Sequence, residues 1–284
     1  MGEAGVEGVE VTRFAPSPTG YLHLGHVYSA RVARDAAREG GGRFLLRMED
    51  IDPGRCRPEF EEAIYEDLGW LGFEWEEPVR RQSEHMDDYG EALARLEGMG
   101  LLYPCFCTRR EIAEEIARAG AAPHGPEGPL YPGICRGMSV GEREERMGRG
   151  EEYAMRLDVG RAMEVAGDLE WVDLERGVIR ARPELLGDVV LARKDVGTSY
   201  HLAVTVDDAI QGVGLVTRGE DLLEATHVHR LLIALLELPV PEWRHHRLLT
   251  GADGKRYAKR DGGVTVRGMR ERGMGVEEVW GQLP

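Results

Sequence analysis

Two histidines flank a glycine near the N-terminus, in the segment RFAPSPTGYLHLGH at residues 13–26. His23 and His26 could donate hydrogen bonds to negative charge that builds up on a phosphate in a transition state. Gly25 lies between them and has no side chain, so a flat or bulky ligand could approach the backbone there. Two histidines without a nearby carboxylate or thiol are a thin ligand set for a metal ion. The pattern favours a phosphate-bearing ligand, and the alternative is a loop with two incidental histidines.

A glycine-bounded basic segment, GADGKRYAKRDG, occurs late in the chain at residues 251–262. Mobile lysines can hold pyrophosphate while an α-phosphate is attacked, as cations do at other phosphoryl-transfer sites. An exposed basic turn is the alternative. The formal net charge of −15 argues against binding nucleic acid by bulk attraction, so any such binding would need a local basic face. Between residues 244 and 272 the basic residues outnumber Asp253, Asp261 and Glu271; they are Arg244, Arg247, Lys255, Arg256, Lys259, Arg260, Arg267, Arg270 and Arg272.

Three of the four cysteines, Cys105, Cys107 and Cys135, lie in a stretch rich in proline and glycine. A Cys-x-Cys pair with a third thiol about one loop away suggests a structural zinc site. Three thiolates need a fourth ligand, and general chemistry nominates His124. The alternative is three buried apolar cysteines, and the spacing makes a poor disulfide framework. Cys56 lies outside this group and is assigned no role.

Alternating strands and helices must position these residues. The patterns predict a strand at 9–15, a helix at 25–39 and a strand at 43–49, which together form a βαβ unit with parallel strands. The histidine segment would then lie at the carboxyl end of the sheet and at a helix N-terminus, where phosphate binds. Further expected elements are helices at 59–71, 84–98, 201–210 and 220–237, strands at 176–181, 188–193 and 213–218, and a surface loop at 138–152.

The order of these elements predicts an α/β fold with a split nucleotide-binding domain. Residues 1–100 and 186–245 are expected to form a Rossmann-like catalytic domain with a parallel sheet. Residues 101–185 are expected to form a zinc-containing insertion. Residues 246–284 would hold the basic loop and a short helical C-terminal segment, with little room for a further domain.

The composition is that of a soluble globular protein, with 42% hydrophobic and 31% charged residues among 284. The N-terminus does not resemble a signal peptide, and no apolar run is long enough for a membrane span. We therefore expect a cytoplasmic protein that acts without a membrane, and we expect a monomer.

The two phosphate-binding candidates resemble the signatures of class I aminoacyl-tRNA synthetases. HLGH at 23–26, preceded by RFAPSPTG, is similar to the HIGH signature as it occurs in the glutamyl and glutaminyl branch. YAKRDG at 257–262 is similar to the KMSKS signature, and Lys259 matches its second lysine. The family binds ATP, with Mg²⁺, through these segments, so the resemblance implies that His23, Gly25, His26 and Lys259 hold ATP. The catalytic residues would be His23, His26 and Lys259.

The second signature departs from the family pattern at four positions. Arg256 replaces the first lysine, Tyr257 the apolar residue, Ala258 the serine and Arg260 the last serine. Positive charge is retained at both basic positions. Because arginine and lysine are not interchangeable where geometry matters, we expect activation to be possible but its rate to depend on these replacements.

Three further strings resemble the glutamyl branch: RMEDID, SYHLAVTVDD and VTRGEDLL. Bound glutamate presents two carboxylates, which suit arginine forks, and one ammonium, which suits an acid. Each candidate alone could instead form a surface ion pair. Together they imply, by analogy with the family, that glutamate is bound by Arg13, Ala15, Ser17, Glu49, Tyr200 and Arg218.

The acceptor and the fourth zinc ligand are also implied by the resemblance. This chain ends about 25 residues past the second signature, and short members of the family are the glutamyl-Q tRNA(Asp) synthetases. They attach glutamate to queuosine in the anticodon loop of tRNA(Asp). A Cys-x-Cys…Tyr-x-x-x-Cys pattern recurs among them, which nominates Tyr131 in place of His124. The other hypotheses are a truncated synthetase that charges the tRNA 3′ end and a non-catalytic regulator that binds glutamate, ATP or RNA.

Overall fold

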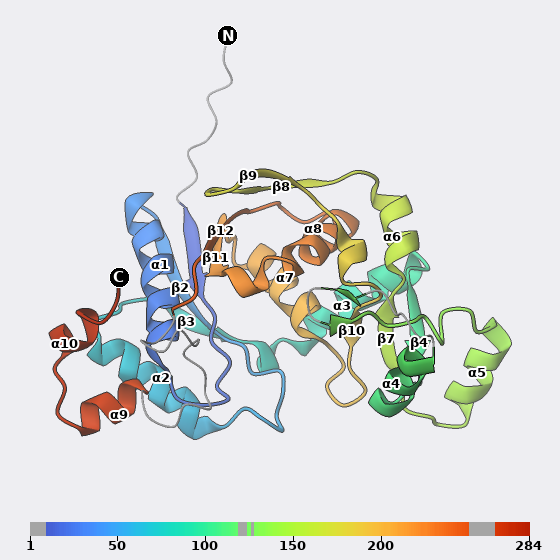
Figure 1. Ribbon diagram of the computed structural model, residues 1–284, viewed down its shortest axis with the longest axis horizontal. Helices are drawn as coiled ribbons and strands as arrows, with labels where there is room; N and C mark the ends of the chain where they lie inside the picture. The colour runs from blue at the N-terminus through green and yellow to red at the C-terminus, as the bar shows by residue number, and fades with distance from the viewer. Residues whose placement is uncertain (1–9, 119–123, 126–127, 250–264) are drawn as a thin grey trace, which may run out of the picture.

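The computed structural model describes residues 10–118, 124–125, 128–249 and 265–284 (Figure 1). The strands are β1 Val11–Phe14, β2 Arg43–Met48, β3 Glu76–Arg81, β4 Leu102–Cys105, β5 His124–Gly125, β6 Gly128–Pro129, β7 Ala154–Leu157, β8 Glu170–Asp173, β9 Gly177–Arg180, β10 Val190–Ala192, β11 Leu215–Gly219 and β12 Glu242–His246. The helices are α1 Leu24–Glu39, α2 Pro58–Trp70, α3 Met86–Gly98, α4 Arg109–Arg118, α5 Val140–Gly148, α6 Val159–Ala166, α7 Tyr200–Ile210, α8 Ala225–Leu235, α9 Val266–Glu271 and α10 Val276–Trp280. Short 3₁₀ helices cover Gln82–Glu84, Pro183–Leu185 and Glu220–Leu222.

The N-terminal βαβ unit is confirmed. β1 pairs with β2 in parallel, and β2 pairs in parallel with β3. Between β1 and β2, α1 places a stripe of small and aliphatic residues against the sheet, among them Val27, Ala30 and Ala33. The helix ends before Gly41, whose φ of 61° is one that glycine adopts without steric strain.

A second group of parallel strands continues the first across β1. β11 pairs with β12 and β12 with β8, all in parallel, while β9 pairs with β8 in the antiparallel sense. The backbone N–H of Gly214 donates to the carbonyl of Val11 at 3.0 Å, and the side chain of Arg13 reaches the carbonyl of Thr217. β1 and β11 therefore lie side by side and run in the same direction. The expected α/β class with a parallel sheet is confirmed.

The strand order creates a crevice between β1 and β11. From β1 the chain crosses to β2 on one side, and from β11 it crosses to β12 on the other. In open α/β sheets, ligands bind outside the carboxyl ends of the strands at such a reversal of strand order. This crevice is therefore where the fold alone would place a ligand.

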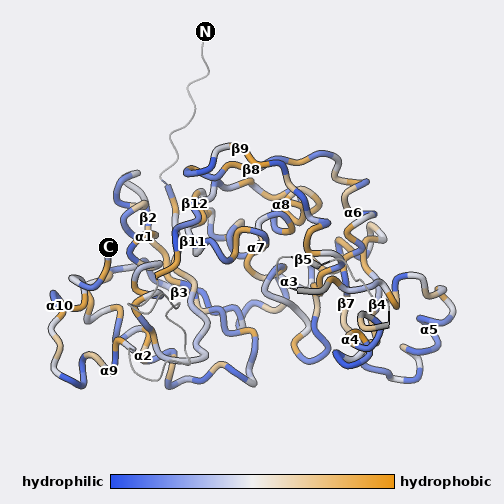
Figure 2. Tube along the Cα trace, in the orientation of Figure 1, coloured by the Kyte–Doolittle hydropathy of each residue, from blue (hydrophilic) through white to orange (hydrophobic). Residues whose placement is uncertain are grey.

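A smaller antiparallel sheet, in the order β10-β7-β4, lies away from α1, α9 and α10 (Figure 1). Beside it, α5 occupies residues that were predicted to form a surface loop, and that prediction is wrong. Ser139 accepts a hydrogen bond from the backbone N–H of Glu142, and the Glu142 carboxylate accepts one from the backbone N–H of Ser139. This capping box starts a helix that buries no side chain and is mostly hydrophilic in Figure 2.

Other differences concern elements with weak sequence patterns. The helix expected at 220–237 is interrupted, because a 3₁₀ turn precedes α8. The patterns did not predict β3, β4, β5, β6, β7, β8 or β12, nor the short helices α4 and α6, whereas α9 and α10 form the short helical C-terminal segment that was expected. Within the described ranges, no helix has both the length and the apolar character needed to cross a membrane.

Candidate active site

A cavity of about 870 Å³ opens at the crevice between β1 and β11. It is lined by the loop after β1, the start of α1, the end of β2, the start of α7 and the end of β11. All residues predicted to bind glutamate or ATP that the structure describes line this one cavity. They are Arg13, Ala15, Ser17, His23, Gly25, His26, Glu49, Tyr200 and Arg218.

His23 and His26 lie together at the N-terminus of α1. Their rings stack with a centroid separation of 3.7 Å, and the backbone N–H of His23 donates to Nδ1 of His26 at 3.2 Å. Because Nδ1 of His26 accepts a hydrogen bond, the neutral ring carries its proton on Nε2, which can act as a donor. The first turn of α1 has no acidic residue, so the positive end of its dipole is not offset there. This corner of the cavity suits a phosphate group.

Arg13 is held by a carboxylate that reasoning from the sequence did not identify. Its Nε donates to Oδ1 of Asp208 at 2.9 Å, and its Nη2 donates to Oδ2 of the same residue at 3.2 Å. The same carboxylate accepts a hydrogen bond from the fully buried Arg47 at 2.8 Å. Burial alone would raise the pKa of Asp208, but Arg13 and Arg47 outweigh it and hold this pKa below its usual value. Asp208 therefore stays ionised and fixes the guanidinium of Arg13.

Arg218 is equally buried but has no anionic partner. Its guanidinium donates to Nε2 of His245 at 3.2 Å, to the Tyr200 hydroxyl at 3.3 Å, to Nδ1 of His229 at 3.1 Å and to the Thr226 hydroxyl. Only 6% of the residue is exposed, and burial lowers the pKa of the guanidinium. Arginine nevertheless remains protonated in proteins. Across the described part of the chain, no carboxylate lies within ion-pair distance of Arg218. The cavity wall therefore carries a buried positive charge that no protein carboxylate neutralises.

Glu49 lies across the cavity at the end of β2. Arg47 pairs with it at 3.3 Å, and the backbone N–H of Glu49 donates to the carbonyl of Pro16, which ties this strand end to the loop of the first signature. Burial raises the pKa of Glu49, while Arg47 and Arg13 oppose that rise. An ammonium group bound beside it would favour the ionised carboxylate further.

The second signature, with Arg256, Tyr257, Ala258, Lys259 and Arg260, lies outside the described residues. The described residues that flank it lie beside the cavity. Leu249 lines the cavity, and Thr265 forms an isolated antiparallel bridge with His23.

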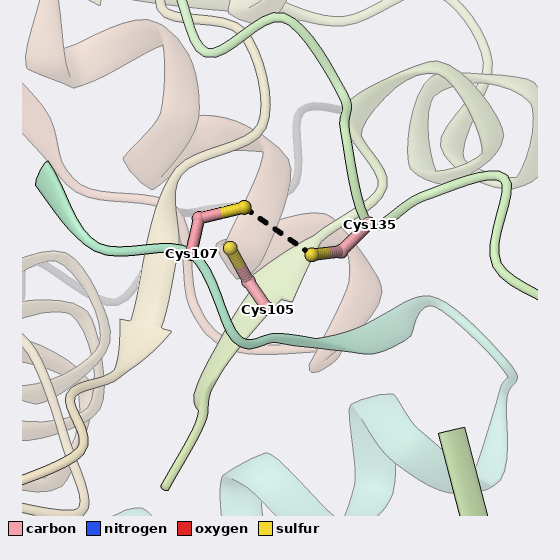
Figure 3. A group of neighbouring side chains, drawn as sticks. All are labelled: Cys105, Cys107 and Cys135. Atoms are coloured by element: carbon pink, nitrogen blue, oxygen red, sulfur yellow. Dashed lines mark hydrogen bonds between the residues drawn. The ribbon is translucent and has the colours of Figure 1, made fainter. Parts of the chain in front are cut away.

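Cys105, Cys107 and Cys135 lie together (Figure 3), and none of them lines this cavity. Their sulfur atoms are all within 4.8 Å of one another, and Cys107 Sγ is 3.4 Å from Cys135 Sγ. The Tyr131 hydroxyl is 3.4 Å from Cys105 Sγ and 3.7 Å from Cys107 Sγ. His124 lies in β5, and its side chain is outside what the structure describes. Cys56 is separate from this cluster and lines the large cavity instead.

Reasoning from the sequence missed several residues that do not line the cavity but hold the two arginines that do. Asp208 belongs to a pair of acids at the end of an otherwise apolar helix, and that unusual placement was the available signal. His229 and His245, which hold Arg218, carry no motif that would have identified them.

Comparison with known proteins identifies the family of the chain that forms this cavity. Residues 10–279 match the family described as tRNA synthetases class I (E and Q), catalytic domain. The chain belongs to this family. The predicted enzyme class, a ligase of the aminoacyl-tRNA synthetase type, is thereby confirmed.

Relatives within the family include a glutamyl-Q tRNA(Asp) synthetase and a glutamate–tRNA ligase. The chain is 49% identical over 275 residues to a glutamyl-Q tRNA(Asp) synthetase of Rhodobacter capsulatus, covering 95% of this chain and 98% of that one. It is 40% identical to a glutamate–tRNA ligase of Aquifex aeolicus, covering 96% of this chain and 56% of that one. The expected resemblance to the glutamyl-Q tRNA(Asp) synthetases is confirmed.

A solved structure of a glutamate tRNA ligase shares the fold. The crystal structure of a glutamate tRNA ligase from Elizabethkingia meningosepticum, in complex with its amino acid, superposes with a TM-score of 0.77 at 30% identity. The match covers 91% of this chain and 54% of that one.

Proposed function

We propose that this chain activates L-glutamate with ATP and transfers the glutamyl group to queuosine in the anticodon loop of tRNA(Asp). The observation that carries the proposal is the uncompensated Arg218, buried in the wall of the same cavity as the histidines at the start of α1. A substrate carboxylate would supply the missing counter-charge. A neutral amide in its place would leave the guanidinium unpaired, which disfavours glutamine by several kcal/mol, on the order of a broken buried pair.

Each predicted site residue is assigned to glutamate or to ATP. Arg13 and Arg218 bind carboxylates, Glu49 binds the ammonium, and Ala15, Ser17 and Tyr200 complete the glutamate pocket. His23, Gly25 and His26 bind ATP at the N-terminus of α1, and Lys259 binds it from the second signature. The positions of Leu249 and Thr265 beside the cavity support this role for Lys259.

The reaction has two steps. A carboxylate oxygen of glutamate attacks the α-phosphorus of ATP, the bond to the bridging oxygen breaks, and pyrophosphate leaves with Mg²⁺. A hydroxyl of the cyclopentene ring of queuosine then attacks the carbonyl carbon, and AMP leaves as the hydroxyl proton is lost. The protein contributes positioning and charge stabilisation. Single-stranded anticodon bases can be splayed into such a cavity.

We further propose a structural zinc ion held by Cys105, Cys107, Cys135 and Tyr131. With Zn–S distances of about 2.3 Å, a tetrahedral site places its sulfur atoms roughly 3.8 Å apart. The separations among these thiols are compatible with that value. Tyr131 is near two of the three sulfurs, which supports it as the fourth ligand, and His124 remains the second candidate.

Two specific observations favour other functions. The identity to the Aquifex ligase favours transfer to the tRNA 3′ end. The four departures in the second signature favour a regulator that binds the same ligands without catalysis.

Mapping the nucleotide that receives labelled glutamate separates the three functions. The protein is incubated with ATP, labelled glutamate and tRNA from cells that make queuosine, and the tRNA is then digested with nuclease. We expect label on the anticodon-loop nucleotide and none with tRNA that lacks queuosine. Label on the 3′-terminal adenosine would favour the charging enzyme, and no label with folded, zinc-loaded protein would favour the regulator.

A further inference from the structure

The two arginines of the glutamate pocket are held in opposite ways. Arg13 has its charge balanced by the buried carboxylate of Asp208. Arg218 makes four hydrogen bonds, all to uncharged groups: two imidazoles, a phenol and an alcohol. Both are buried to a similar extent, at 5% and 6% exposure, so burial does not explain the difference.

A buried carboxylate fixes the orientation of the first imidazole without reaching Arg218. Nδ1 of His245 lies 2.7 Å from Oδ2 of Asp173. Because the carboxylate can only accept, His245 carries its proton on Nδ1, and Nε2 is left to accept from Arg218. Thr226 also lies 3.1 Å from this Nε2, so it donates there while its oxygen accepts from Arg218.

The orientation of the second imidazole, that of His229, is fixed by His201. Nε2 of His229 lies 3.1 Å from Nδ1 of His201, while Nδ1 of His229 accepts from Arg218. Neutral His229 therefore has its proton on Nε2 and donates it to His201. Burial and the nearby Arg218 lower the pKa of His229 well below its usual value and that of His201 to about 4. They also lower the pKa of His245 to about 4, against the opposing effect of Asp173.

We propose that His229, His245 and Thr226 are positioning residues that determine specificity for an acidic amino acid. They hold the guanidinium of Arg218 in place with neutral acceptors, so its positive charge is left for the carboxylate of the substrate. A carboxylate at any of these positions would orient Arg218 equally well but would neutralise it. The proposal rests on the proposed function, because it assumes that the substrate of this cavity is glutamate.

A matched pair of substitutions at His229 tests the charge separately from the shape. Asparagine places its oxygen where Nδ1 of His229 accepts from Arg218, and aspartate has the same shape with a negative charge. Both lose the hydrogen bond to His201 equally. ATP–pyrophosphate exchange is measured with glutamate and with glutamine for the wild type, His229→Asn and His229→Asp, and thermal unfolding confirms that each is folded.

We expect the KM for glutamate to be about tenfold or more higher in His229→Asp than in His229→Asn, because the introduced charge competes with the substrate carboxylate. The preference for glutamate over glutamine should fall by a similar factor. The KM for ATP should differ by less than about twofold between the two variants, because a charge at this site has no reason to weaken phosphate binding. If His229 had only a structural role, both variants would change the KM for glutamate by the same factor.

Equal glutamate KM values and equal preference in the two variants would overturn the proposal. If His229→Asp does not fold, the pair Thr226→Asn and Thr226→Asp makes the same comparison from the other side of Arg218. Failure of the glutamate activation on which the proposal rests has a different signature, because the folded wild type would then show no glutamate-dependent exchange at all.

Discussion

At the scale of single residues, the site depends on which charges are paired. Asp208 accepts hydrogen bonds from both Arg13 and Arg47 in the interior, so its loss would leave two buried guanidinium groups short of counter-charge. Breaking a buried pair by removing one partner is far more costly than breaking an exposed one, because the remaining charge cannot be solvated. Asp208 should therefore matter for stability as well as for the position of Arg13.

Asp208→Asn is expected to lower the free energy of unfolding by about 3–5 kcal/mol in urea denaturation. Glu76→Gln is the control, because Glu76 pairs with Arg43 on the surface, where 46% and 49% of the two side chains are exposed. That variant should show little measurable change. Similar losses for the two variants would contradict the role given to Asp208.

The sequence was informative about residues in contiguous signatures and uninformative about their partners. Arg13, His23, His26 and Arg218 belong to local strings that could be recognised directly. Asp208 lies 195 positions from Arg13 in the chain, and their contact exists only once β1 and α7 are packed together. Such a pairing has no local periodicity, so a single sequence could not reveal it.

At the scale of elements, strong hydrophobic patterns predicted the central elements, and weak patterns hid the others. The βαβ unit combines buried strands with an amphipathic helix, and it was predicted correctly. The polar helix α5 buries no side chain, so only its Ser139–Glu142 capping box could have indicated it. Phe106 lies between two of the clustered cysteines, and its carbonyl accepts a hydrogen bond at 3.2 Å from Lys194 in the loop after β10.

Zinc should therefore stabilise the segment that carries the cysteines and its contact with the loop after β10. The purified protein is expected to contain one zinc ion per chain, and a chelator should lower its thermal midpoint. Cys135→Ser should lose the metal, because it removes one of the three thiolates that bind the zinc ion. Cys56→Ser is the control and should retain it, since Cys56 lies outside the cluster. A zinc-free wild type, or full zinc in Cys135→Ser, would contradict the site.

At the scale of the whole molecule, two groups of parallel strands meet at β1 and β11, and the cavity opens where they meet. One group supplies Arg13, the histidines of α1 and Glu49, and the other supplies Arg218. The proposed reaction needs both, because ATP and glutamate must lie side by side for in-line attack. The domain boundaries expected from the sequence remain predictions, whereas the convergence of distant segments on one cavity is a property of the fold.

Glutamate-dependent ATP–pyrophosphate exchange without added tRNA tests this central claim most directly. We predict that the wild type catalyses exchange with glutamate and far less with glutamine, that Arg218→Ala abolishes it, and that Lys259→Ala slows it by about tenfold or more. Exchange at wild-type rates in both variants would contradict the account, as would equal exchange with glutamate and glutamine.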